Sequence, residues 1–110
     1  MKDLRLYVLQ RGTAALLAPM ILVHLVVIYL ATARGLSGAD LLSRTHGNWV
    51  WGAFYTLFVL AAAVHGAIGI RVVLREWTCA SVGLVDTIMW VAGLVLLALG
   101  LRAVYAVVLA

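Results

Sequence analysis

Residues 50–77, VWGAFYTLFVLAAAVHGAIGIRVVLREW, form a long apolar segment that contains one histidine and ends in charged and aromatic side chains. An α-helix needs about 20 apolar residues to cross the hydrocarbon core of a bilayer, and this segment is long enough. His65 lies well inside it, where an imidazole is costly unless it pairs with or binds another group. The segment therefore predicts a membrane-spanning helix whose histidine needs a partner.

Two other apolar segments, residues 13–33 and 82–110, are also long enough to span a bilayer. Of the 110 residues, 66% are hydrophobic, and a soluble domain of this length could not bury that much apolar surface. Each span must be helical because backbone polar groups are satisfied internally in lipid. The sequence predicts an all-α membrane protein with a single domain of three transmembrane helices, at about 13–33, 50–74 and 82–109.

Basic residues are distributed unevenly over the ends of these spans. Five flank the start of the first span and the end of the second: Lys2, Arg5, Arg11, Arg71 and Arg75. The loop between the first two spans holds only Arg34 and Arg44. The excess of positive charge predicts a cytoplasmic N-terminus. The basic residues form no contiguous patch, so no nucleic acid partner is expected.

His65 is surrounded at helical spacing by small residues: Ala61, Ala62, Gly66 and Gly69. Small side chains allow the close approach of either a second helix or a flat cofactor. In the first case His65 is a hydrogen-bonded core histidine, and in the second it is an axial ligand of haem iron. Arg71 and Arg75 favour haem, because cations near the membrane surface suit the propionates of a haem edge.

His24 is the second histidine inside a predicted span, and Pro19 precedes it by about one helical turn. Proline kinks a membrane helix and frees one carbonyl. Three roles are open for His24: haem ligation, a hydrogen bond to that carbonyl, or packing. If Arg11 and Arg75 lie at similar depths, His24 and His65 differ by only a few ångströms in height.

The loops contain two further residues with side chains that can bind metals or react. His46, in the loop between the first two spans, is expected to be solvated, and Ser37 in the same loop can cap a short surface helix. Cys79, the only cysteine, lies in the loop before the third span, so no internal disulfide is possible.

Two motifs resemble the membrane-anchor (cytochrome b) subunits of succinate dehydrogenase and fumarate reductase. HGAIGIR at residues 65–71, followed by Glu76 and Trp77, resembles the family's His-x-x-x-Gly-(Ile/Leu/Met)-Arg and the acidic–aromatic pair in its second helix. QRGTA at residues 10–14 resembles the Arg-x-(Ser/Thr)-(Gly/Ala) element that opens its first helix. Glu76 replaces the more usual aspartate, and Trp77 replaces a tyrosine or phenylalanine; unlike tyrosine, tryptophan cannot donate a phenolic proton.

The resemblance implies a haem b-binding anchor of a succinate:quinone oxidoreductase, in the multi-pass class of the bacterial inner (cytoplasmic) membrane. Flavoprotein and iron–sulfur subunits would bind its cytoplasmic face, and the anchor would pass electrons between the iron–sulfur subunit and membrane quinone. The chain would catalyse nothing alone but would serve the respiratory chain as part of this complex. Whether the complex oxidises succinate or reduces fumarate is left open.

By the same resemblance, His65 is an axial ligand of the haem iron and Arg71 lies near a propionate. His24 is a possible second haem ligand. Four residues are implied in the quinone site: Arg11, Thr13, Glu76 and Trp77. Glu76 is open to a role in proton relay or to pairing with a nearby arginine or a partner subunit.

A haem needs more room than the separation of about 8–10 Å between directly packed helices. The second axial ligand for His65 is therefore expected from another chain, either a sister anchor subunit or a second copy. An alternative function is a haem-free structural anchor of a respiratory complex, in which His65 only packs.

Overall fold

The computed structural model describes residues 2–109, which form four helices and no strand. These are α1 (Lys2–Ala33), α2 (Gly38–Thr45), α3 (Trp49–Trp77) and α4 (Val82–Val108). Three of them, α1, α3 and α4, are long and apolar enough to cross a membrane. The predicted all-α membrane protein with three spans is confirmed.

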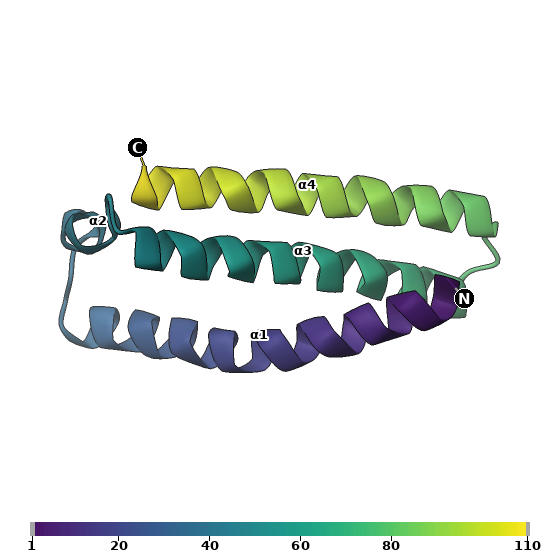
Figure 1. Cartoon of the computed structure of the whole chain (residues 1–110), viewed down its shortest axis with the longest axis horizontal. Coiled ribbons are helices and arrows are strands. Elements are labelled where there is room, and N and C mark those ends of the chain that lie inside the picture. The colour runs from purple at the N-terminus through teal and green to yellow at the C-terminus, as the bar shows by residue number, and fades with distance from the viewer. Residues whose placement is uncertain (1, 110) are drawn as a thin grey trace.

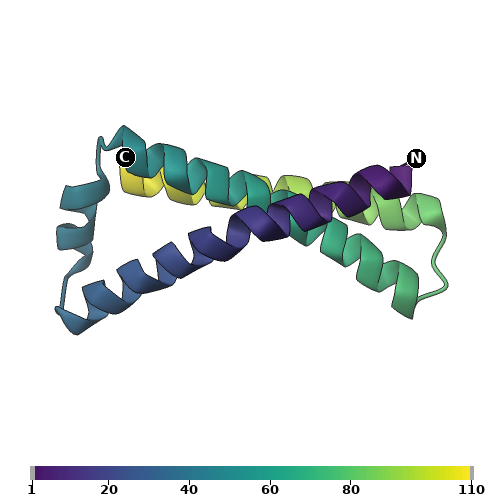
Figure 2. The ribbon, with the colours of Figure 1, turned by 60° about the horizontal axis from the view of Figure 1, so that its bottom comes forward.

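The three long helices are arranged around α3, which lies between α1 and α4 (Figure 1). The N-terminus and the α3–α4 loop lie at one end of the bundle, here called the N-terminal end, and α2 and the C-terminus lie at the other, here called the α2 end (Figure 1). Helices α3 and α4 run side by side, whereas α1 crosses α3 obliquely and diverges from it toward the α2 end (Figure 2).

Close contact between α3 and α4 depends on glycines in α4. A Cβ on Gly93 would lie 3.2 Å from the Cβ of Ala67, and a Cβ on Gly100 would collide with the side chain of Val59. Small residues at such positions let helix backbones approach one another in a membrane, where van der Waals packing drives association. The α3–α4 pair is therefore the tightly packed part of the fold.

Helix α1 is longer than the sequence predicts. It begins at Lys2, not near residue 13, so residues 2–10 are already helical and continue into the predicted span. No helix-breaking residue stands in this stretch, and Asp3 in the first turn is favourable to the helix dipole. The helix bends near its middle, where Pro19 occurs in the sequence (Figure 1).

Helix α2 is the short surface helix that Ser37 was expected to cap. The Ser37 side chain accepts a hydrogen bond from the Asp40 backbone N–H at 3.1 Å, and the Ser37 N–H donates to the Asp40 carboxylate at 2.8 Å, which completes a capping box. The bond from the Ser37 N–H lowers the pKa of Asp40. Two bonds of 2.7 Å connect the end of α2 and the loop after it to the end of α4: the Thr45 hydroxyl donates to the Val107 carbonyl, and the Gly47 N–H donates to the Val108 carbonyl.

Candidate functional site

His65 lies where α1 crosses α3, and its nearest polar partner is Thr13. The Thr13 Oγ1 atom is 3.2 Å from Nδ1 of His65, and both side chains are half-buried. The same hydroxyl lies 2.7 Å from the Leu9 carbonyl oxygen and 3.1 Å from the Gln10 carbonyl oxygen. The crossing thus joins two residues that the sequence assigned to different sites.

The glycines that follow His65 are used for helix packing. A Cβ on Gly66 would lie 3.1 Å from a methyl group of Leu96 in α4. A Cβ on Gly69 would lie 3.5 Å from the Gln10 amide nitrogen in α1. Of the two roles that the sequence left open for these small residues, close helix approach describes both glycines. The side-chain oxygen of Gln10 is buried and has no hydrogen-bond partner within residues 2–109.

His24 has mainly aromatic surroundings, toward the α2 end of α1. Its ring meets those of Tyr55 and Phe58 edge-on, at centroid distances of 5.7 and 5.6 Å. Its Nδ1 atom is 3.4 Å from the Tyr55 hydroxyl oxygen. His24 also lines an apolar cavity of about 350 Å³, whose wall includes Gly100 and Val104 of α4.

The two histidines lie at different levels along the bundle, because the condition on which a similar height depended is not met. His24 follows Thr13 by eleven residues in α1, and its partner Tyr55 precedes His65 by ten in α3. At about 1.5 Å per helical residue, the two sites are about 15 Å apart along the bundle. The premise of equal depth fails because Arg75 reaches Asp3, at 3.8 Å, which stands eight residues before Arg11.

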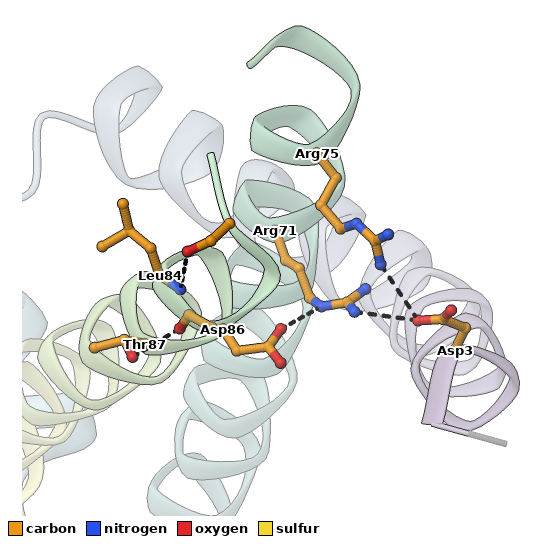
Figure 3. A network of polar contacts seen from close by, with 8 residues as sticks. Asp3, Arg71, Arg75, Leu84, Asp86 and Thr87 are labelled. Carbon is orange, nitrogen blue, oxygen red and sulfur yellow. Dashed lines mark hydrogen bonds and ion pairs between the residues drawn. The ribbon is translucent and has the colours of Figure 1, made fainter. Parts of the chain in front are cut away.

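Arg71 is buried at the N-terminal end of the bundle, with 6% of its surface exposed, and holds two carboxylates (Figure 3). Its Nε donates to Asp86 of α4 at 2.8 Å, and its Nη2 donates to Asp3 of α1 at 3.1 Å. One guanidinium therefore connects all three spans. The sequence pattern did not predict this network, although both acids lie near helix starts on the same predicted side as Arg71.

The four residues implied in the quinone site do not share one place on this chain. Thr13 lies in the crossing, whereas the Arg11 guanidinium points toward the N-terminal end, 6.0 Å from the Tyr7 ring centroid. Glu76 and Trp77 are exposed at the end of α3, and eleven residues separate Glu76 from His65, about 16 Å along the helix.

The remaining candidates lie outside these clusters. His46 and Cys79 are both exposed in loops. Within residues 2–109, no group of three or more His, Cys, Asp or Glu side chains could hold a metal ion.

The fold and site define a small three-span membrane protein with a histidine held at a helix crossing and a buried arginine near one end. The chain matches the family model of the succinate dehydrogenase/fumarate reductase transmembrane subunit over residues 2–101, and it belongs to this family. Comparison with curated proteins gives no significant match, and neither does comparison with solved structures. Membership implies a subunit of a complex that also contains flavoprotein and iron–sulfur subunits.

Proposed function

We propose that this chain is the haem b-binding anchor of a succinate:quinone oxidoreductase in the bacterial inner membrane. It tethers the flavoprotein and iron–sulfur subunits and passes electrons between the iron–sulfur subunit and quinone. The observation that carries the proposal is His65: an imidazole within a span, half-buried, and hydrogen-bonded through one ring nitrogen to Thr13 at 3.2 Å. A histidine that ligates a metal usually uses its second nitrogen in this way.

The donor set fits a haem that is shared with another chain. A neutral imidazole held at Nδ1 keeps Nε2 available as an axial ligand. The apolar cavities of about 260 and 350 Å³ do not include His65 in their walls. A sister anchor subunit or a second copy of this chain would supply the other ligand. Bound haem b supplies a one-electron redox centre.

We retain the proposal that Arg71 lies near a propionate, but a propionate would have to compete with the two carboxylates that Arg71 already binds. Asp3 has a side chain that is 74% exposed, whereas that of Asp86 is 18% exposed. A propionate that approached Arg71 would therefore replace Asp3, the more solvated of the two acids. His24 remains a candidate ligand only for a second haem, about 15 Å from the level of His65.

Quinone binds in this proposal at the N-terminal end, which is cytoplasmic. Arg11 supplies a positive charge near a quinone oxygen, where it would stabilise the negative charge that develops on reduction. Glu76 and Trp77 form the rim at the end of α3, where Glu76 can exchange protons with water and Trp77 can donate only through its indole N–H. Because Arg11 and the rim are separated along the bundle, the iron–sulfur subunit completes the site between them.

A haem-free structural anchor is the second candidate. Two observations favour it: Gly66 and Gly69 are used for helix packing, and Arg71 already has two carboxylate partners. In this function the Thr13–His65 bond only joins α1 to α3. The two candidates differ in whether the purified complex contains haem b.

The test is the haem content of the complete complex purified with His65→Gln. We expect the reduced b-type absorption band and the extractable haem to be lost, because glutamine offers no imidazole nitrogen to iron. His46→Gln, in an exposed loop, is the matched control and should keep wild-type haem. His24→Gln should also keep the haem that depends on His65. A wild-type complex without haem b would establish the structural anchor instead.

A further inference from the structure

The Thr13 hydroxyl faces more acceptors than it has protons. Its single proton can be donated to the Leu9 carbonyl at 2.7 Å, shared with the Gln10 carbonyl at 3.1 Å, or donated to Nδ1 of His65 at 3.2 Å. The shortest contact is the bond to the carbonyl four residues earlier, which is the usual local bond of threonine in a helix. The hydroxyl proton is therefore donated to the Leu9 carbonyl in the backbone of α1.

The hydrogen bond from Thr13 to the backbone decides which ring nitrogen of His65 carries the proton. With its proton donated to Leu9, Oγ1 of Thr13 presents only lone pairs to Nδ1. The contact is a hydrogen bond only when Nδ1 carries a proton and donates it. A neutral imidazole then has an unprotonated Nε2, which is the atom that can bind iron. The opposite tautomer would place two lone pairs against each other.

The rest of the crossing supports the same assignment. Gln10, one turn from Thr13, has a buried side-chain oxygen that meets no hydrogen-bond donor among the described residues, and its amide nitrogen lies beside Gly69. The side-chain acceptors contributed here by α1 are therefore the Gln10 amide oxygen and the Thr13 hydroxyl oxygen. An acceptor that lacks a donor at the crossing favours a histidine that donates toward α1.

We infer that Thr13 is a positioning residue for His65: its hydroxyl oxygen accepts a hydrogen bond from Nδ1–H, sets the tautomer with a bare Nε2 and fixes the ring for haem ligation. The inference rests on the proposed haem-binding function. It also removes Thr13 from the quinone site, because the one proton that it could donate to a quinone oxygen is already donated to the backbone of α1.

The variants are Thr13→Val, which keeps the shape but removes the hydroxyl, and Thr13→Ser, which keeps the hydroxyl. Thr32→Val is a matched control, because Thr32 makes the same bond to the carbonyl four residues earlier, at 2.9 Å to Ile28 in α1, and is exposed. Each variant is measured in the purified complete complex. The readouts are the midpoint potential of the haem and the rate of haem transfer to apomyoglobin.

Thr13→Val should raise the midpoint potential, because an imidazole that loses its acceptor is a less basic ligand and stabilises ferric iron less. Haem loss should accelerate by about tenfold or more, the usual effect of removing such a partner on metal affinity. Thr13→Ser and Thr32→Val should match the wild type. If Thr13→Val does not assemble, Thr13→Cys, with a poor acceptor of similar size, should show the same changes.

The inference would be overturned if the hydroxyl-free variants kept the midpoint potential and the rate of haem loss of the wild type. Equal effects of Thr13→Ser and Thr13→Val would also overturn it. Retention of haem by His65→Gln would instead overturn the proposed function. The two failures are therefore distinguishable in the same set of preparations.

Discussion

The two ends of the bundle place a histidine in different surroundings. Toward the N-terminal end α1 crosses α3 closely, and His65 meets a hydroxyl whose proton is already donated to the backbone. Toward the α2 end α1 diverges, and His24 lies among aromatic rings beside an apolar cavity of about 350 Å³. The longer contact of His24 to Tyr55, at 3.4 Å, allows either group to donate. Whether an intramembrane histidine donates or accepts a hydrogen bond is therefore set by the other bonds of its partner and not by its depth.

The largest effect on stability should come from Arg71→Met, which removes the cation that holds the N-terminal end together. Its guanidinium bonds Asp86, whose side chain is only 18% exposed, and breaking a buried pair costs about 3–5 kcal/mol. The free energy of unfolding, measured by denaturant titration of the complex in mixed micelles, should fall by that amount.

Arg75→Met is the matched control, because Arg75 is 41% exposed and lies 3.8 Å from Asp3. Its loss should cost about 0–1 kcal/mol, as for other solvated pairs. Equal losses for the two arginines would show that the N-terminal end is not held by the buried guanidinium.

A smaller effect should follow from Gly100→Ala, which tests the close α3–α4 contact beside the cavity near His24. The new Cβ would collide with the Val59 side chain, and overpacking of this kind costs about 1–3 kcal/mol. Thermal unfolding of the purified complex should show the loss, and the double variant with Val59→Ala should recover most of it. Gly83→Ala, in the first turn of the same helix with open space around it, should cost nothing. A neutral Gly100→Ala would mean that α4 can move away from α3 at this level.

The smallest effect is expected in α2, from Asp40. Bonds from Ser37 lower the pKa of Asp40 in the folded protein. The carboxylate therefore stabilises the cap at pH values above its ordinary range, and this stabilisation is lost as the pH falls through the lowered folded-state pKa. The protection factors of the α2 amides against hydrogen exchange, which are corrected for the intrinsic pH dependence of exchange, should fall on acidification, with those of α3 and α4 unaffected. Asp40→Asn should remove this pH dependence, and its persistence would assign the effect to another group.

Much of the fold was predictable because lipid imposes simple rules. The three spans follow from apolar length alone, and the motifs at residues 10–14 and 65–71 predict the family that the match over residues 2–101 confirms. The register between helices was not predictable, because no local pattern says which α1 residue lies beside Arg75. Asp3, and not Arg11, lies beside Arg75, so His24 lies at a different level along the bundle from His65.

Within the candidate site, the sequence identified the residues but not their partners. Thr13 and His65 were both singled out, yet they were assigned to quinone and haem separately, and the structure brings them within 3.2 Å. Arg71 was interpreted as a cation for a propionate, and its two carboxylates were missed. Such pairings depend on the angle at which α1 crosses α3, which side-chain types alone do not encode.

The network around Arg71 also has an order in time, because a ribosome makes its members one after another. Asp3 is synthesised first, Arg71 follows 68 residues later, and Asp86 comes 15 residues after that. A carboxylate is thus already present when the guanidinium leaves the ribosome, and the second arrives with the last helix. The nascent chain can neutralise its most buried charge before α4 is complete, and Asp86 then locks the three-helix arrangement.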